Sequence, residues 1–384
     1  MDNTIDATYN QDAFDPSRAS SGEKRRPAQR SIERERSIWN KKKQNSLVMA
    51  ARMGAIGRMK RCGRMSACAE TLISDVCCIC ETRYIVQAYF CRDRICPVCS
   101  WRRSKKLAQK LKQIIALNER EKKSRYIFLT LTVENVPWSA LADEIKTIMK
   151  SWDKFGKRIR RASIVTGWVR TFEVTRSVKF DNAHPHLHIL MQVPPEYFDP
   201  DDPMWLAYKK DDLIKQWQEC LCADYGPSIK VQAVRDNDYS MMRSILEVAK
   251  YIAKGDDISG LSDGDFRHYV DAIHGVRVWS SGGRMKIKDS EIEEFLHDGE
   301  MTHEEGTCGN CGGQLIEMRE VWSQKLGVYV VKTEIDFDKI KYFKQAGLTN
   351  HSGNHTINLT IETNGGNVYV GGSLCRDNQK FSEN

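Results

Sequence analysis

The sequence predicts an α+β fold, an antiparallel sheet of the split β-α-β type with helices packed on one face. Segments of alternating apolar and polar residues are interleaved with longer amphipathic segments in the order β-α-β-β-α-β, and a further helix follows. A cysteine-rich segment precedes this run, with eight of the thirteen cysteines between Cys62 and Cys99. We therefore expect a sheet domain preceded by a metal-binding segment.

The individual elements follow from local composition and periodicity. Strands are predicted where β-branched and aromatic residues alternate with polar ones, over residues 124–133, 166–177, 185–193 and 228–236. Amphipathic periodicity predicts helices over residues 139–161, 202–226 and 240–255. Because the first two helices each connect a pair of strands, we expect them on one face, which leaves the other face available for a site.

The composition divides the chain into four regions. Residues 1–45 are polar and charged with almost no aliphatic pattern, so we expect a disordered basic N-terminal tail. Residues 46–120 form a cysteine-rich segment that we expect to bind zinc and contact DNA, and residues 121–290 form the sheet domain. Residues 291–384 form a C-terminal region whose end is polar and partly strand-like.

Charge and hydropathy exclude some classes of protein. Lys and Arg total 59 against 51 Asp and Glu, a net charge of +8, and the mean hydropathy is -0.53. Basic residues cluster on either side of the cysteine-rich stretch, which favours contact with a nucleic-acid backbone over the alternative of solvated helix faces. Nothing approaches the roughly 18 apolar residues of a membrane span or the order of a signal peptide, so we expect a cytoplasmic protein without a membrane partner.

His186 and His188 form the sharpest candidate site. Alternate residues of a strand project from one face, so the two imidazoles lie about 7 Å apart at the backbone and can share a divalent ion. Glu173, brought back by a hairpin, is the candidate third ligand. Two neutral imidazoles and a carboxylate suit Mg²⁺ or Mn²⁺ acting as a Lewis acid. His184 is a rival ligand, although Pro185 is expected to interrupt the strand geometry; the alternative is a hydrogen-bonded histidine cluster.

Glu247, Tyr251 and Lys254 form a second candidate group. On one continuous helix their spacing places all three on nearly the same face. The pKa of a tyrosine is ordinarily about 10, so a reacting phenol needs an electropositive surround and a polarised phosphate. A carboxylate one turn away can act as a general base. The same pattern is common on exposed helices, where it makes only an ion pair.

The clustered cysteines predict structural zinc rather than disulfides. Four of five cysteines are expected to bind one Zn²⁺: Cys77, Cys80, Cys91, Cys96 and Cys99. We favour the two Cys-x-x-Cys pairs of this group, with Cys91 the main competitor, and leave Cys62, Cys78 and free thiols as alternatives. The basic run 101–106 follows directly, and we expect the zinc to orient it toward DNA phosphates.

A further pair, Cys308 and Cys311, resembles half of a zinc ribbon. A glycine follows each cysteine, which suits the tight turn of a metal knuckle, but a second pair is missing nearby. His297, His303 and Cys375 are the candidates to complete this site.

Three segments together resemble the motifs of a known family. They are FLTLTVENV (128–136), HPHLHILMQV (184–193) and EVAKYIAKGDD (247–257). The chain resembles the single-tyrosine plasmid rolling-circle replication initiators (Rep) of the HUH endonuclease superfamily, whose catalytic sheet is ferredoxin-like. The segments 90–107 and 272–286 are similar to the family as well, so the resemblance covers roughly residues 60 to 290. Thr130 and Thr132 are expected to support the sheet rather than take part in chemistry.

The resemblance implies an activity for these residues. His186 and His188 would hold the catalytic metal, with Glu173 in the place of a third polar ligand. Tyr251 would attack one strand of the plasmid double-strand origin, presented single-stranded or as a hairpin, leaving a 5′-phosphotyrosine and a free 3′-hydroxyl. Glu247 matches the carboxylate that activates water at termination, and the strand would later be rejoined or released.

The chain contains no phosphate-binding loop, so we expect host helicase, polymerase and single-strand binding protein as partners. Three alternatives stay open. An HUH relaxase or single-strand transposase shares the metal and tyrosine, a non-catalytic zinc-containing DNA-binding regulator has structural histidines, and an unrelated metallohydrolase cleaves without a covalent adduct. The cysteine segment before the first motif and the single E-x-x-x-Y favour the initiator.

Overall fold

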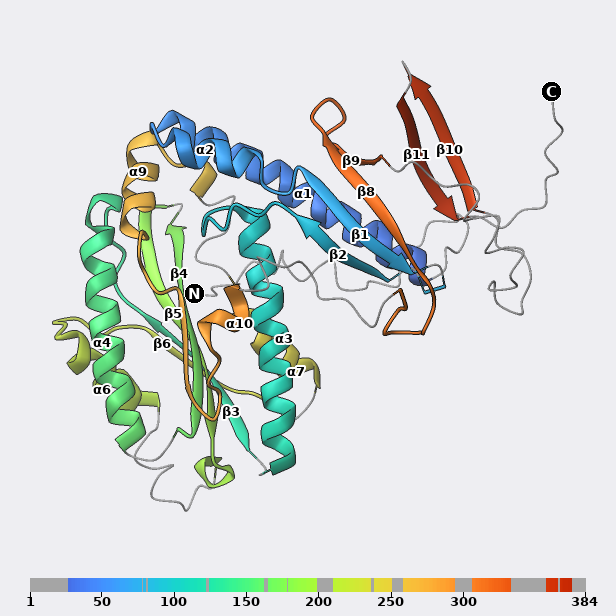
Figure 1. Cartoon of the computed structure of the whole chain (residues 1–384). Helices are drawn as coiled ribbons and strands as arrows, with labels where there is room; N and C mark the ends of the chain where they lie inside the picture. The colour runs from blue at the N-terminus through green and yellow to red at the C-terminus, as the bar shows by residue number, and fades with distance from the viewer. Residues whose placement is uncertain are drawn as a thin grey trace, which may run out of the picture.

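Two antiparallel sheets and the helices around them form an α+β fold, as the sequence predicted (Figure 1). The computed structural model describes residues 27–77, 79–80, 82–121, 124–161, 165–177, 179–198, 210–235, 238–250, 258–293, 306–332, 357–364 and 367–374. None of the helices within these ranges is long and apolar enough to span a membrane.

The five-stranded sheet carries the candidate metal ligands and has the strand order β6-β3-β5-β4-β7. Its strands are β3 (Arg125–Thr132), β4 (Gly167–Ser177), β5 (Asn182–Val193), β6 (Ile229–Ala233) and β7 (Trp279–Gly283). Every neighbouring pair is antiparallel. The first four coincide with the four predicted strands, and β7 was not predicted.

Helices cover both faces of this sheet (Figure 1). On one face lie α4 (Leu141–Arg161) and α6 (Lys210–Leu221), the two helices predicted to connect strands. The opposite face, which we expected to be left open, is partly covered by α3 (Pro97–Glu121) and α7 (Asp238–Val248). The candidate metal ligands lie on this second face, next to the apolar layer in which α3 and α7 pack against the sheet.

Alternation along the strands explains the two apolar layers. Phe172 and Leu187 point toward α4 and α6, where they share a core with Trp217. Val169 and Leu190 point the other way and pack in the layer beneath α3 and α7. The side chains of β4 and β5 that point this way therefore lie on the sheet face against which the last turn of α7 packs.

Edge strand β7 depends on close backbone approach rather than on side-chain alternation. A Cβ on Gly282 would lie 2.8 Å from Trp168 Nε1, and a Cβ on Gly283 would lie 2.2 Å from the Thr166 carbonyl oxygen. Gly283 also has a φ of +59°, in the region that favours glycine. The sequence of this strand carries no β-branched pattern, which is why periodicity did not predict it.

The six-stranded sheet joins the cysteine-rich segment to the C-terminal region in the order β10-β11-β9-β8-β1-β2. Its strands are β1 (Thr71–Cys77), β2 (Arg83–Ala88), β8 (Leu315–Ser323), β9 (Val328–Val331), β10 (Ile357–Asn364) and β11 (Asn367–Leu374). Strand β8 pairs with β1 along its length, with Leu315 opposite Cys77. The regions expected at 46–120 and 291–384 therefore share one sheet.

Helix α1 (Pro27–Ala55) precedes the strands of both sheets in the chain and is followed by α2 (Met59–Ser66). It begins within the stretch expected to be disordered, so that expectation does not hold from Pro27 onward. Arg52 of α1 donates to Asp263 Oδ1 at 2.6 Å, at the start of α9 (Asp263–Ala272) beside the five-stranded sheet. The short elements η2 (Trp138–Ala140), η3 (Pro195–Phe198) and α10 (Asp289–Glu293) complete the described fold.

Candidate active site and metal centres

The three predicted ligands of the catalytic metal lie together on β4 and β5. Glu173 is directly opposite His186 in the antiparallel register. Its Oε2 lies 3.3 Å from His186 Nε2 and 3.0 Å from His188 Nε2. Adjacent ligands of an octahedral ion with 2.1 Å bonds are separated by about 3 Å. The donor set and its spacing therefore fit a small divalent cation.

Hydrogen bonds fix which nitrogen each histidine offers to a metal. His188 Nδ1 lies 3.2 Å from the hydroxyl of Thr130, its cross-strand neighbour on β3. His186 Nδ1 lies 3.1 Å from the carbonyl oxygen of His184 and donates to it. The Nε2 atoms of both rings point toward Glu173 and are the nitrogens that a metal held beside this carboxylate would bind. Thr130, expected only to support the sheet, also orients a ligand.

The surroundings keep Glu173 ionised. The side chain is 6% exposed, and burial alone would raise the pKa of its carboxyl. The hydrogen bonds and charges of the two neighbouring imidazoles outweigh burial and hold the pKa of Glu173 well below its ordinary value. An anionic carboxylate between two imidazoles is the state that binds a cation.

His184 stands beside this group and is not part of it. Its Nδ1 lies 2.6 Å from Asn135 Oδ1, and burial together with the charge of His186 lowers the pKa of His184 to about 4. Pro185 lies within β5 and does not interrupt the strand, contrary to our expectation. His184 instead contributes its carbonyl oxygen, which positions His186.

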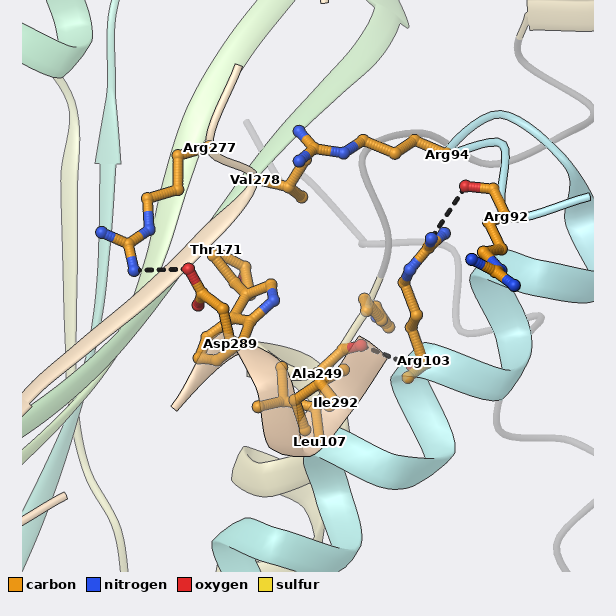
Figure 2. Close-up of a pocket in the computed structure, with 13 residues that line it drawn as sticks. Arg92, Arg94, Arg103, Leu107, Thr171, Ala249, Arg277, Val278, Asp289 and Ile292 are labelled. Atoms are coloured by element: carbon orange, nitrogen blue, oxygen red, sulfur yellow. Dashed lines mark hydrogen bonds and ion pairs between the residues drawn. The ribbon is translucent and has the colours of Figure 1, made fainter. Parts of the chain in front are cut away.

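The chain leading to Tyr251 lies on the same side of the sheet as the metal ligands. The predicted helix 240–255 ends earlier, since α7 stops at Val248, so the expected i, i+4 relation of Glu247 to Tyr251 on one helix does not hold. Ala249 is buried in the apolar layer beside Leu107 (Figure 2). Glu247 forms an ion pair with Lys250. Tyr251 and Lys254 lie outside the described residues.

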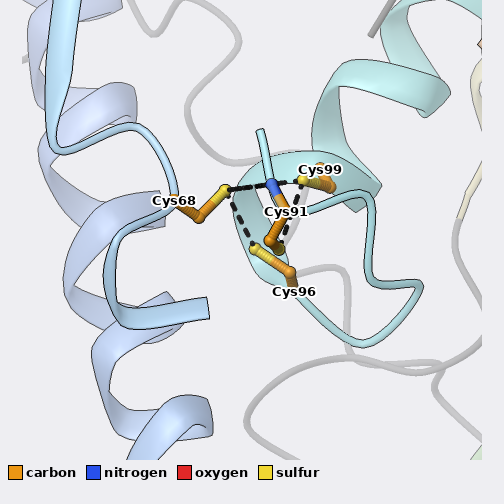
Figure 3. A group of neighbouring side chains, drawn as sticks. All are labelled: Cys68, Cys91, Cys96 and Cys99. Carbon is orange, nitrogen blue, oxygen red and sulfur yellow. Dashed lines mark hydrogen bonds between the residues drawn. The ribbon is translucent and has the colours of Figure 1, made fainter. Parts of the chain in front are cut away.

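One group of four cysteines lies where α1 and α2 meet the start of α3. It consists of Cys68, Cys91, Cys96 and Cys99, all buried (Figure 3). Their sulfurs are separated by 3.5 Å between Cys68 and Cys99 and by 3.7 Å between Cys91 and Cys99. Four sulfurs around a tetrahedral zinc with 2.3 Å bonds lie about 3.8 Å apart. The spacing fits such a site.

A second group joins residues far apart in the chain. It consists of Cys77, Cys80, Cys308 and Cys311. Sulfur separations are 3.4 Å between Cys77 and Cys311 and 3.5 Å between Cys80 and Cys308. The pairing of β1 with β8 brings the two Cys-x-x-Cys pairs together. This group ties the cysteine-rich segment to the C-terminal region.

The predicted grouping of the cysteines was therefore wrong, although most ligands were named. The two pairs that we combined belong to different groups, and Cys91 is a member rather than a competitor. The half ribbon at Cys308 and Cys311 is completed by Cys77 and Cys80. The alternatives that we considered for it, His297, His303 and Cys375, lie outside the described residues, as does Cys78.

Cys68 is the candidate ligand that sequence reasoning missed. It has no Cys-x-x-Cys partner, so spacing gave no signal for it. Cys62, which we left open, belongs to neither group. It packs instead at the edge of the apolar core.

Backbone amides donate hydrogen bonds to sulfur in both cysteine groups, although the neighbouring thiols of Cys99 and the burial of Cys77 keep the pKa of each above its ordinary value. The amide of Arg92 donates to Cys99 Sγ at 3.3 Å, and the amide of Cys80 donates to Cys77 Sγ at 3.5 Å. Burial raises the pKa of Cys80, whereas hydrogen bonds from Thr82 and neighbouring thiols lower it, and the result is a pKa of about 6. Thiolates are the form that binds zinc.

The basic run 101–106 is more internal than we expected. Arg102 is 1% exposed, and its guanidinium carbon lies 3.9 Å from the centroid of the Phe90 ring. Arg103 is buried too and donates to the Arg92 carbonyl oxygen at 2.8 Å. The prediction that this run faces DNA is therefore wrong for Arg102.

Comparison with known proteins decides the family. A family model described as replication protein matches residues 82–330, which is more than half of the chain. The chain belongs to the replication protein family. This confirms the family resemblance drawn from the sequence motifs.

Curated relatives agree with this membership. The chain is 34% identical over 279 residues to "Protein rep" of Lactiplantibacillus plantarum, covering 69% of this chain and 85% of that protein. It is 29% identical over 309 residues to "Protein rep" of Bacillus amyloliquefaciens, covering 73% and 86%. It is 35% identical to "Protein rep" of Streptococcus pneumoniae over 172 residues, 44% of this chain and about half, 53%, of that protein. No solved structure matches the chain.

Proposed function

We propose that this replication protein initiates rolling-circle replication of a plasmid by nicking one strand of its double-strand origin. The observation that carries the proposal is the Glu173–His186–His188 group, whose Oε2 and Nε2 atoms lie 3.0 to 3.3 Å apart. The group sits on the sheet face where α7 and Ala249 lead to the proposed nucleophile, Tyr251. A metal-binding group and a tyrosine are the components that tyrosine transesterification needs.

In the proposed reaction the phenol oxygen of Tyr251 attacks the scissile phosphorus. A bond forms between this oxygen and phosphorus, the bond from phosphorus to the 3′-oxygen breaks, and a 5′-phosphotyrosine remains. The phenol proton passes to a base and the departing 3′-oxygen gains a proton. Because one phosphate ester replaces another, the 3′-hydroxyl can reverse the step and rejoin the strand. In the sequence Lys250 and Lys254 lie on either side of Tyr251, and positive charge near a phenol favours its ionisation.

Glu247 is proposed as the base for the tyrosine or for a water molecule at termination. Its carboxylate is about one-third exposed and pairs with Lys250. This pairing holds the carboxylate within the segment that leads to Tyr251. It would abstract the proton from water when the covalent intermediate is hydrolysed.

Glu173, His186 and His188 are proposed to hold Mg²⁺ or Mn²⁺, which would withdraw charge from the scissile phosphate as a Lewis acid. The two cysteine groups are proposed to hold structural Zn²⁺. The catalytic region is proposed to be residues 121–290, with DNA contacts extending into residues 46–120. The proposed partners are origin DNA, single-stranded or in a hairpin at the nick, and host helicase, polymerase and single-strand binding protein, all in the cytoplasm.

The test is a covalent-adduct assay. The purified full chain is incubated with Mn²⁺ and labelled single strands covering the replicon that encodes it, and the products are separated on a denaturing gel. We expect a labelled protein band that Tyr251→Phe abolishes. Tyr239→Phe is the matched control, because Tyr239 is 73% exposed on α7 and should leave the band unchanged.

The same assay separates the alternatives. A non-catalytic regulator binds DNA without cleavage, and a metallohydrolase produces shortened strands without a labelled protein band. An adduct that persists in Tyr251→Phe would contradict the assignment of the nucleophile. An HUH relaxase or transposase would give the same adduct, but the family match to replication proteins disfavours it.

A further inference from the structure

A cationic pocket lies between the first cysteine group and the five-stranded sheet (Figure 2). Its volume is about 330 Å³. Its cationic lining residues are Arg92, Arg94, Arg103, Lys250 and Arg277. A single carboxylate, Asp289, lines it as well, and Arg277 binds that carboxylate at 2.8 Å. The pocket therefore suits an anion.

The pocket adjoins the candidate catalytic metal site. Thr171, which lines it, is directly opposite His188 in the pairing of β4 with β5. Side chains opposite one another in this way have Cβ atoms about 5 Å apart. Lys250, another lining residue, immediately precedes Tyr251 in the chain. A group bound here lies next to the proposed metal site and to Lys250, the residue that precedes the proposed nucleophile in the chain.

The hydroxyl of Thr171 supplies an independent sign of a ligand. The residue is 2% exposed, and its Oγ1 has no hydrogen-bond partner among the described residues. A buried hydroxyl without a partner costs about 1–3 kcal/mol of stability. Such a cost is offset when a bound group accepts the hydrogen.

The cysteine-rich segment forms one wall of the pocket. Arg92 and Arg94 lie on the loop between Cys91 and Cys96, two members of the first cysteine group. The guanidinium of Arg94 donates to the Val276 carbonyl oxygen, which connects this loop to the strand segment leading into β7. On α3, Ser104 donates to the carbonyl oxygen of Ala249. The loop, α3 and the segment before Tyr251 are thus held together.

We propose that this pocket binds a backbone phosphate of the single-stranded DNA beside the scissile bond. The proposal rests on the proposed nicking function for its substrate. Arginine recognises phosphate through paired N–H donors. In this pocket Arg92 is exposed and lies at the rim, whereas Thr171 is buried and lies deep in the pocket. The half-buried indole of Trp279 adds an aromatic wall on which a base can stack. An anion site with one aromatic wall matches a nucleotide of an unpaired strand.

The test measures binding separately from cleavage. Fluorescence anisotropy of a labelled mixed-sequence single strand is recorded with the full chain at several salt concentrations, without added Mg²⁺ or Mn²⁺. We expect Arg92→Gln to weaken binding about fivefold near 0.1 M salt and to lower the slope of log affinity against log salt by about 0.7. The double variant Arg92→Gln/Arg277→Gln should weaken binding further.

Arg160→Gln is the matched control, because Arg160 is exposed on α4 at the opposite face of the sheet. It removes the same charge and should leave the affinity within about twofold of the wild type. Equal effects of Arg92→Gln and Arg160→Gln, or an unchanged salt slope in Arg92→Gln, would overturn the proposal.

Thr171→Val gives a second readout that a purely structural role would not produce. Valine keeps the shape of threonine but removes the unpartnered hydroxyl, so the melting temperature should stay the same or rise while DNA affinity falls severalfold. A lower melting temperature with wild-type affinity would contradict a phosphate contact.

The pocket and the nicking function fail separately. If Arg92→Gln weakens DNA binding but the wild type forms no covalent adduct, the proposed phosphate pocket is retained and the proposed nicking function is rejected. If Arg92→Gln binds DNA normally and the wild type forms the covalent adduct, only the proposed phosphate pocket is rejected.

Discussion

The ammonium group of Lys43 lies 2.8 Å from the carbonyl oxygen of Cys68 and 2.6 Å from that of Ser66, fully buried beside the first cysteine group. Burial lowers the pKa of Lys43, and negative charge on the neighbouring sulfurs opposes this shift. Four thiolates around a divalent ion carry a net charge of −2. The buried ammonium would therefore offset one of the two negative charges of a metal-bound state of this group.

Lys43→Met should destabilise this site. The substitution removes a buried cation and two hydrogen bonds, so we expect the free energy of unfolding to fall by about 3 kcal/mol. Zinc transfer to a chelating dye should be faster. Lys41→Met is the matched control, since Lys41 is exposed on the same helix and should change stability by less than about 0.5 kcal/mol. Similar behaviour of the two variants would argue against charge balance by Lys43.

The zinc content of single-cysteine variants tests the two groups. We expect about two zinc ions per chain by elemental mass spectrometry, and about one after either Cys68→Ser or Cys311→Ser. The double variant should contain none, and Cys222→Ser, at an exposed cysteine outside both groups, should retain both ions. One ion in the wild type, lost in either single variant, would instead indicate a shared site.

Removing the carboxylate between the histidines should weaken the catalytic metal site. Glu173→Gln keeps the side-chain shape but not its charge, so Mn²⁺ affinity measured by calorimetry should fall at least about tenfold. Glu134→Gln, at an exposed position just after β3, should bind Mn²⁺ like the wild type. Unchanged affinity in Glu173→Gln would mean that the carboxylate is not a ligand.

The hydrogen bond between His188 Nδ1 and the Thr130 hydroxyl should contribute to metal affinity. Thr130→Val frees the ring of His188, and we expect Mn²⁺ binding to weaken about tenfold. Thr132→Val is the control, because Thr132 lies on the same strand but its hydroxyl binds the Ser228 carbonyl at 2.7 Å. If both substitutions weaken binding equally, the effect comes from sheet packing rather than from orientation of His188.

The five-stranded sheet could be predicted because its strands follow from local sequence patterns. Strand alternation places His186 and His188 on one face, and a short hairpin brings Glu173 opposite His186. The end of α7 could not be predicted, because apolar periodicity continues past Val248 although the helix does not.

The cysteine groups could not be predicted because their geometry is tertiary. Cys77 and Cys311 are separated by 234 residues and meet only through the pairing of β1 with β8. Cys68 follows α2 and reaches its group through the packing of α1 and α2 against the loop before α3. Spacing rules combine cysteines that are close in sequence. They therefore joined two Cys-x-x-Cys pairs that belong to different groups in the structure.

Mass spectrometry of the protein–DNA adduct tests the central claim most directly. The adduct is digested with nuclease and trypsin, which cleaves after Lys250 and Lys254, and nucleotide-bearing peptides are sequenced. We predict a phosphotyrosyl nucleotide on the peptide of residues 251–254. A nucleotide on any other tyrosine, or strand cleavage with no modified peptide, would contradict the account.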